Sequence, residues 1–302
     1  MSVEFADPFS APGRWYKGNL HTHTTESDGK LAPNEVICRY RAAGYDFLSL
    51  TDHNRVTVVD EPPGENFLLL LGVEMDAGRT DIGGIYHVVG FGLTHADKVP
   101  RYLAVPKALA WIEEHGGEAL IAHPYWSALV ASDLVRQPEG HLGIEVFNTG
   151  CLDLGRAYSS VHWDDVLSRG LRFWGFAVDD AHHAVKDRLP TDTARAWVMV
   201  KAPELTREAI LESLRRGLFY ASWGPTIEDI AIHDGEVSVR TSPVKEINFI
   251  AQSWFGAGHV PMDAPALTDA TYRLTGEERY LRVECRDAEG RWAWSNPIYL
   301  AE

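Results

Sequence analysis

The feature that most constrains the fold is a regular alternation of short apolar runs and helix-like segments over residues 15–220. The apolar runs predict strands at residues 20–23, 47–50, 67–73, 86–91, 119–122, 143–147, 172–178 and 196–200. The helix-like segments cover residues 33–43, 106–115 and 206–216, and each ends just before a glycine. This alternation predicts an α/β fold with a mostly parallel sheet, and seven or eight such units indicate a barrel.

Several of these predicted strands end in a residue that can bind a metal ion. Barrels of this kind carry their chemistry at the C-terminal ends of the strands. Random scatter of the 13 histidines would not favour strand ends so consistently, so we expect a shared rim of ligands. The residues at these ends are His21, His23, His53, Glu74, His123, Asp180 and His182.

The spacing within this set also predicts how some side chains point. Residues two apart share a face only on extended backbone, so His21 with His23, and Asp180 with His182, should point the same way. Two neutral imidazoles that converge on one point are typical ligands of a divalent transition metal. Taken alone, the histidine pair could also be two partly exposed loop residues.

The composition limits the class of protein. Of the 302 residues, 45% are hydrophobic and 24% are charged, as in an ordinary globular protein. The net charge of −15 argues against a long nucleic acid as the main partner and favours a small anionic substrate. The three cysteines are far apart and form no CxxC pair, so we expect them to be reduced and buried. Neither a signal peptide nor a membrane span is visible, which indicates a cytoplasmic protein.

The pattern changes after Tyr220. Short alternating strands are predicted at residues 227–233, 236–241, 247–251, 272–274, 280–286 and 298–300. We therefore predict two domains, a barrel over residues 1–221 and a small antiparallel, sandwich-like β domain over residues 222–302. Trp292 and Trp294 alternate in the tail and are expected in the core of the β domain.

Taken in order, the motifs resemble those of the PHP (polymerase and histidinol phosphatase) family of metal-dependent phosphoesterases. The resemblance covers roughly residues 15–220. Its motifs are His21-Thr22-His23, Ser27-Asp28-Gly29, Thr51-Asp52-His53, Gly72-Val73-Glu74, His87 in His-Val-Val-Gly-Phe-Gly, His123-Pro124 and Asp180-Ala181-His182. The tail resembles the small β domain that follows some stand-alone members of the family.

The resemblance implies a distorted (β/α)7 barrel that holds two or three divalent metal ions. Because an oxygen ligand at Asp28 weakens the case for zinc, manganese and iron stay open beside it. By position, the first ion would be bound by His21, His23, Glu74 and Asp180, the second by Glu74, His87 and His123, and the third by Asp28, His53 and His182.

Physical chemistry supports the same assignment. Glu74 must be a carboxylate if it bridges two cations, because only a carboxylate offers one oxygen to each. Asp52 is expected to accept a hydrogen bond from a ligand imidazole. Asp180 is preferred over Asp179 by its spacing from His182. The residues we expect to take part in catalysis are His21, His23, Glu74, Asp180 and His182.

Other readings stay open for some residues. Asp28 could merely shape a turn, and His87 could be a strand histidine that faces a helix. Glu145 and Asn148 either line the site or make structural hydrogen bonds. We interpret the remaining histidines as structural or solvated: His95, His115, His141, His162, His183, His233 and His259. A substrate phosphate would need cationic partners, for which the candidates are Lys17, Arg55, Arg79, Arg156, Arg188 and Arg195.

The sequence thus predicts a metal-dependent phosphoesterase in which metal-activated hydroxide attacks a small phosphomonoester or a nucleotide-type phosphate ester. The small phosphorylated substrate would be its main partner. Two alternatives remain: a nuclease of short oligonucleotides, which needs a basic, aromatic-lined approach, and a metal-stabilised binding scaffold without turnover.

Overall fold

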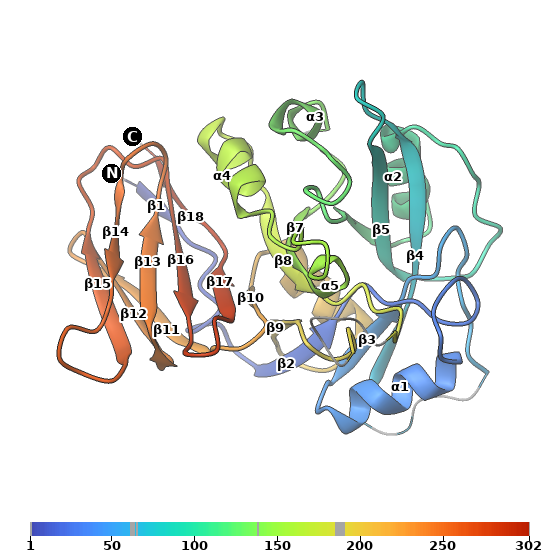
Figure 1. The fold of residues 1–302 in the computed structure, drawn as a ribbon, viewed down its shortest axis with the longest axis horizontal. Coiled ribbons are helices and arrows are strands. Elements are labelled where there is room, and N and C mark those ends of the chain that lie inside the picture. Colours follow the sequence, from blue (N-terminus) through green and yellow to red (C-terminus); the bar gives the residue numbers. More distant parts are fainter. Residues whose placement is uncertain (1, 61–63, 65, 138, 185–190, 302) are drawn as a thin grey trace.

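The fold of the protein, seen in a computed structural model, combines one large curved sheet, one small sheet and few helices (Figure 1). The structure describes residues 2–301 except residues 61–63, 65, 138 and 185–190. Its helices are α1 (Pro33–Ala42), α2 (Val105–Glu114), α3 (Ala131–Val135), α4 (Ser160–Ser168) and α5 (Arg207–Arg215), with a 3-10 turn η1 (Thr149–Cys151).

The strands that carry or precede the predicted ligands lie in the large sheet together with β7 and β9, in the order β9-β2-β3-β4-β5-β6-β7-β8. Helix α1 packs on β3, α2 on β5, α4 on β7 and α5 on β9. The strands are β2 (Arg14–Asn19), β3 (Phe47–Leu50), β4 (Leu68–Arg79), β5 (Ile85–Leu93), β6 (Glu118–Ile121), β7 (Gly143–Asn148), β8 (Trp174–Val178) and β9 (Trp197–Ala202).

The sheet is mixed rather than mostly parallel. The pairs β2–β3, β3–β4, β6–β7 and β7–β8 are parallel, as expected from the strand–helix alternation. In contrast, β5 is antiparallel to both β4 and β6, and β9 is antiparallel to β2. A short turn joins β4 to β5, so these two strands form a hairpin, and a hairpin can only be antiparallel.

The segments that follow β2 and β8 lie side by side, although these two strands are far apart in the sheet order. Thr22, just after β2, forms an isolated parallel bridge with Ala181, just after β8. The backbone N–H of Asp180 donates to the carbonyl of His21 at 2.9 Å, and that of His23 donates to the carbonyl of Ala181 at 3.0 Å. The sheet therefore curves until the segments that carry the ligands of β2 and β8 touch. The (β/α)7 barrel stays a prediction.

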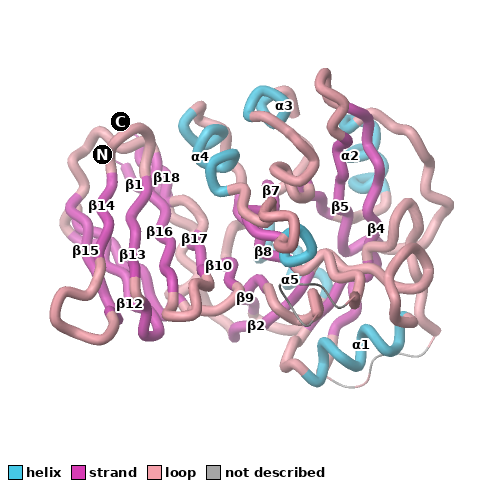
Figure 2. Tube along the Cα trace, viewed as in Figure 1, coloured by secondary structure: helices cyan, strands magenta, loops and turns pink. Residues whose placement is uncertain are grey.

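The rest of the chain forms strands joined by loops, with no helix among its described residues, as Figure 2 shows on the left. β11, β12 and β15 form the small sheet, and the other strands extend the large sheet. Side chains from both sheets, among them Ile230, Val239, Phe249 and Val283, share one core. The strands are β1 (Ser2–Glu4), β10 (Phe219–Ser222), β11 (Ile227–His233), β12 (Glu236–Val244), β13 (Glu246–Ile250), β14 (Gly256–His259), β15 (Leu267–Arg273), β16 (Tyr280–Arg286), β17 (Trp292–Ser295) and β18 (Ile298–Ala301).

Backbone pairing joins this β region to the ligand-bearing half. β10 pairs with β9 on one side and with β17 on the other, and β1 pairs with β18. Trp294 is buried and stacks on Phe147 of β7, with ring centroids 5.8 Å apart. The division into domains at residue 221 stays a prediction, and one sheet runs across it.

Several sequence expectations about local structure need correction. The predicted strand at residues 20–23 lies beyond the end of β2, and β4 continues past Val73 to Arg79. Strands β1, β10, β14 and β17 and helices α3 and α4 were not predicted. The cysteines are unpaired, as expected, but Cys38 is exposed rather than buried. Among the described residues, none of the helices combines the length and apolar character needed to cross a bilayer.

A buried arginine also ties the two regions together. The Arg282 guanidinium of β16 donates to both carboxylate oxygens of Asp164 in α4, at 2.8 and 2.7 Å, and to Glu284 at 2.8 Å. It also lies 5.0 Å from the ring centre of Trp163. Arg282 is therefore fully paired in a place where an unpaired charge would be costly.

We expect Arg282→Ala to lower the free energy of unfolding by about 3 kcal/mol. This is the lower end of the range for breaking a buried ion pair, because Asp164 is partly exposed. Denaturant unfolding followed by circular dichroism measures it. Arg240→Ala removes an exposed pair with Asp229 and should change stability by less than about 1 kcal/mol. Equal effects of the two variants would contradict this account.

Candidate metal centre

The structure brings all nine predicted ligand side chains into one cluster. They come from different elements: His21 and His23 follow β2, Asp28 lies in the loop beyond them, and His53 follows β3. Glu74 and His87 lie within the paired strands β4 and β5. His123 follows β6, and Asp180 and His182 follow β8. Glu74 is thus inside its strand, not at the strand end that the sequence suggested.

The innermost group consists of His21, His23, Glu74 and Asp180, all buried. Asp180 Oδ1 lies 3.3 Å from His21 Nε2 and 3.0 Å from His23 Nε2. Glu74 Oε2 lies 3.3 and 3.2 Å from the same two nitrogens. The edges of a tetrahedron around an ion at about 2.05 Å measure about 3.3 Å, so these atoms are spaced like ligands of one ion.

The second group uses the other oxygen of Glu74. Oε1 lies 2.7 Å from His87 Nδ1 and 3.2 Å from His123 Nε2. Glu74 therefore presents Oε2 to the first group and Oε1 to the second. Oε2 is buried and accepts no hydrogen bond among the described residues, although imidazole nitrogens lie 3.2–3.3 Å away and buried carboxylate oxygens are normally satisfied. A cation on each side of Glu74 would satisfy both oxygens.

The third group, Asp28, His53 and His182, is more exposed than the other two. The exposed fractions of these side chains are 54%, 29% and 26%. Asp28 Oδ2 lies 3.2 Å from His182 Nε2 and 3.9 Å from His53 Nε2. His23 also contributes here, because its Nδ1 lies 3.7 Å from Asp28 Oδ1. The sequence had assigned His23 to the first group alone.

A buried glutamate orients the first ligand. Glu145 Oε1 accepts a hydrogen bond from His21 Nδ1 at 2.7 Å, and Oε2 accepts from the backbone N–H of His123 at 2.7 Å. Asn148 donates to Glu145 at 2.8 Å and to Asp180 at 3.2 Å. With its Nδ1 proton fixed in this way, His21 directs the lone pair of Nε2 at the first group. Of the two readings left open for Glu145 and Asn148, the structure therefore shows hydrogen bonding that positions ligands.

The role expected of Asp52 is wrong in detail. Its carboxylate accepts hydrogen bonds from Thr24, from Ser27 at 2.6 Å and from Thr57 at 2.5 Å, not from an imidazole. Ser27 precedes Asp28, so Asp52 holds the loop that carries the exposed ligand. The hydrogen-bonding role expected of Asp52 belongs to Glu145, whose place beside His21 comes from strand β7.

The side chains of the two neighbouring aspartates after β8 have different surroundings. Asp179 is buried and accepts hydrogen bonds from Tyr40 at 2.7 Å and from the N–H of Ala196 at 2.7 Å. Asp180 faces the ligand group and has a φ of 50°, while His123 has a φ of 28°. Non-glycine residues seldom adopt this left-handed region, and such strain is often found at functional sites.

The electrostatics of the cluster favour cations. Burial opposes ionisation of Glu74 and Asp180, but the surrounding imidazoles outweigh it and hold both pKa values well below their ordinary range. Burial also opposes protonation of His23, yet Asp180 and Glu74 raise its pKa to about 9. The pKa of His21 is raised well above its ordinary value in the same way. Without metal, the carboxylates would therefore be balanced by protons on these imidazoles.

An open cavity borders the cluster. It has a volume of about 370 Å³ and is lined by Asp180 and His182 together with Trp126, Leu154 and η1. Trp126 is 39% exposed, and its ring centre lies 4.9 Å from that of the predicted ligand His123. The approach to the predicted ligands is therefore partly aromatic.

The candidate phosphate-binding cations are spread widely. Lys17 lies between the rings of Tyr45 and Trp197, and Arg79 donates to the carbonyl of Gly83. The backbone N–H of Arg195 donates to Asp179, and Arg188 lies outside the described residues. Arg55 pairs with Glu26 in the loop before Asp28. Arg156 lies 5.6 Å from the ring centre of Tyr125, next to Trp126.

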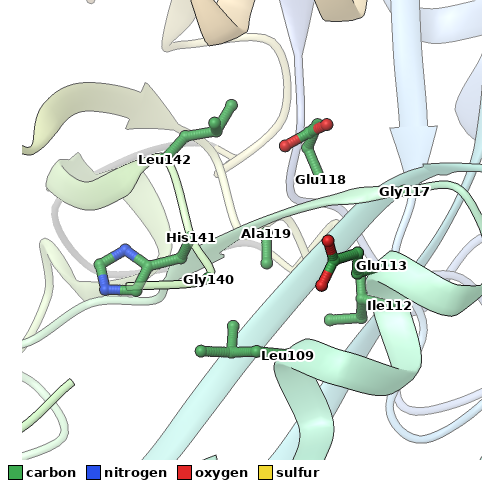
Figure 3. A pocket seen from close by; sticks show the side chains of 9 residues that line it. All are labelled: Leu109, Ile112, Glu113, Gly117, Glu118, Ala119, Gly140, His141 and Leu142. Carbon is green, nitrogen blue, oxygen red and sulfur yellow. The ribbon is translucent and has the colours of Figure 1, made fainter. Parts of the chain in front are cut away.

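A second cavity lies between α2 and the first residues of β6 (Figure 3). His123 follows the other end of that strand. The volume of this cavity is about 280 Å³. His141 in its wall contacts the carbonyls of Gln137 and Gly143, and Glu118 pairs with Arg215. The side chains of His141 and Glu118 therefore already have protein partners, as the structural reading of His141 predicted.

Comparisons with known proteins agree with this fold. No family model matches the chain. A two-domain protein from Bacteroides vulgatus, described as containing a predicted PHP-like metal-dependent phosphoesterase, has a similar structure, with a TM-score of 0.50 and 17% identity. The match covers 92% of this chain and 93% of that one. The expected resemblance to PHP-like proteins is therefore confirmed at the level of the fold.

One curated protein is similar in sequence over a shorter stretch. A 5′-3′ exoribonuclease from Haemophilus influenzae is 36% identical over 99 residues, which is 31% of this chain. The match spans 35% of the exoribonuclease, about a third of its length.

Glu145→Gln is expected to weaken binding of the first metal ion by about 10- to 100-fold, because a neutral amide has one acceptor oxygen for the two donors, His21 Nδ1–H and the N–H of His123, that Glu145 satisfies. Titration of metal-free protein with Mn²⁺ measures this. The exposed Glu212→Gln serves as the control and should bind as the unmodified chain does. Unchanged affinity in Glu145→Gln would show that Glu145 does not position His21.

Metal affinity should rise with pH between about 7 and 9. The pKa of His23 in the metal-free protein is about 9, so an ion that binds Nε2 at pH 7 must displace a proton. Each displaced proton should raise the affinity about tenfold per pH unit until the pH reaches the pKa of His23. Mn²⁺ titrations at several pH values, with proton release measured in two buffers, test this. Binding that is independent of pH would contradict the assignment of His23 as a ligand.

Proposed function

We propose that the chain is a metal-dependent phosphoesterase that binds two or three divalent ions, manganese, iron or zinc, in a distorted (β/α)7 barrel. The observation that carries this proposal is the placement of Glu74, which gives one carboxylate oxygen to each of two ligand groups. Carboxylate-bridged pairs of ions are typical of enzymes that cleave phosphate esters. The PHP-like fold supports the same class of chemistry.

In this proposal the protein supplies positions and charges. Bound divalent ions would supply an activated water and a clamp for the phosphoryl oxygens. His21, His23, Glu74 and Asp180 would hold the buried ion, and Glu145 positions His21 through a hydrogen bond to Nδ1. The third group faces solvent, so a substrate phosphate would arrive beside Asp28 and His182. No covalent intermediate with a side chain is needed.

The substrate we propose is a small phosphomonoester or a nucleotide-type ester. The cavity beside His182 is large enough for a group of about the size of a base, and Trp126 offers an exposed ring at its edge. Bases stack readily on such rings. The net charge of −15 agrees better with a short substrate than with an extended strand.

A nuclease of short oligonucleotides is the second candidate. The exposed Tyr125 and Trp126, with Arg156 over the ring of Tyr125, provide an aromatic and partly basic approach to the cluster. The local similarity to an exoribonuclease points in the same direction. The third possibility, a scaffold without turnover, predicts metal-dependent folding and no release of phosphate from any ester. The cytoplasmic location stays a prediction.

The phosphoesterase proposal predicts that chelation abolishes phosphate release from p-nitrophenyl phosphate or mononucleotides and that Mn²⁺, Fe²⁺ or Zn²⁺ restores it. Glu74→Gln and Asp180→Asn should lower kcat/KM by at least about 10³-fold, since each removes charge that holds the ions in place. The exposed His233→Ala is the control and should retain full activity. Turnover that survives chelation would refute the proposal.

Trp126→Ala distinguishes substrates that carry a base, such as a dinucleotide, from phosphomonoesters without one, such as p-nitrophenyl phosphate. If a base stacks on Trp126, kcat/KM for a dinucleotide should fall by about 5- to 150-fold, the equivalent of about 1–3 kcal/mol per stacked base. The kcat/KM for p-nitrophenyl phosphate should change little, because that substrate has no base. Equal losses on both substrates would mean that Trp126 supports the ligands and does not bind a base.

A further inference from the structure

A second cluster of metal-binding residues lies away from the nine-residue centre. It consists of His95 and Asp97, in the loop after β5, and His115, at the C-terminal end of α2. His87 and Leu93 are six positions apart along strand β5, a distance of about 20 Å at the usual rise per residue. The sequence interpretation had treated His95 and His115 as structural or solvated.

Hydrogen bonds fix which nitrogen of each imidazole carries its proton. His115 Nδ1 lies 2.7 Å from the carbonyl of Trp111, so Nδ1–H donates and Nε2 keeps its lone pair. The Thr94 hydroxyl donates to the carbonyl of His115 at 2.9 Å and therefore accepts from His95 Nδ1–H, at 2.8 Å. His95 Nε2 is thus also left with a lone pair.

Both lone pairs face a carboxylate. Asp97 Oδ2 lies 3.5 Å from His95 Nε2 and 3.4 Å from His115 Nε2. Three electron-pair donors therefore converge with no proton among them, an arrangement that a cation stabilises. A protonated imidazole paired with Asp97 would approach to about 2.7–2.9 Å, whereas the edges of a tetrahedral zinc site measure about 3.4 Å. The observed spacing fits the metal better.

We propose that His95, Asp97 and His115 form a separate zinc site that fastens the loop between β5 and α2 to the end of α2. Two imidazoles and one carboxylate are a common ligand set for zinc, with water in the fourth position. His95 and Asp97 are more than half exposed, so water can occupy that position. The contacts to Thr94 and Trp111 orient the two imidazoles, as the outer contacts of zinc-bound histidines do.

The backbone already joins the loop after β5 to the end of α2. The N–H of Thr94 donates to the carbonyl of His115 at 2.9 Å, so the two segments already meet where the metal would bind. The loop beyond Asp97 is exposed at Lys98 and Arg101. A zinc ion at this point would hold the start of that loop to the helix without any part in the chemistry at Glu74.

The test counts zinc bound by the full-length chain after metal removal and refilling with zinc alone. His95→Ala and Asp97→Asn should each bind about one zinc ion fewer than the unmodified chain, or bind it at least about tenfold more weakly. Both side chains are exposed, so neither change should affect folding, which circular dichroism can verify. His233→Ala removes an exposed histidine that pairs with its neighbour Asp234 and should leave the count unchanged.

Trypsin cleavage gives an independent measurement. Zinc should slow cleavage at Lys98 and Arg101 in the unmodified chain and in Glu74→Gln, but not in Asp97→Asn. This pattern separates the loop site from the centre around Glu74. Equal zinc counts and equal zinc affinities in Asp97→Asn and the unmodified chain, or protection by zinc that persists in Asp97→Asn, would overturn the proposal and leave the three residues as ordinary surface contacts.

Discussion

The buried carboxylate of Glu74 is the constraint on which the rest of the site depends. Its two oxygens face different groups of imidazoles, and one of them accepts no hydrogen bond among the described residues. A buried carboxylate in such a place is costly unless positive charge lies on both sides. The position of Glu74 inside β4, rather than in a loop, keeps this geometry rigid. Ligands from β2, β5, β6 and β8 can then converge on it.

The sequence predicted this convergence well because it follows from chain geometry. Strands β3 and β7 and helices α1, α2 and α5 lie within about two residues of their predicted bounds, which is the usual precision of such limits. The nine predicted ligands, which the structure brings together, were proposed from residue types at or near strand ends and from the order of their motifs. Both signals are local, and a one-dimensional pattern is enough to detect them.

Features that depend on contacts across the fold were missed. The pairing of β4 with β5 continues the strand past Glu74, and no local signal marks that extension. Glu145 orients His21 from 124 positions along the chain. His23 Nδ1 lies near Asp28 of the third group because residues 24–28 turn back toward His23 and are hydrogen-bonded to Asp52. The pairing of His95 with His115 depends in the same way on where the loop after β5 meets α2.

The exposed third group and the buried pair of groups suggest a division of tasks within one centre. Buried ligands hold ions tightly and exclude water, while exposed ones let a substrate phosphate approach. The central claim is that Glu74 bridges two ions, and electron paramagnetic resonance of the Mn²⁺-loaded chain tests it most directly. The account predicts the signal of an exchange-coupled pair, lost in Glu74→Gln. A signal from isolated ions only, the same in both proteins, would contradict it.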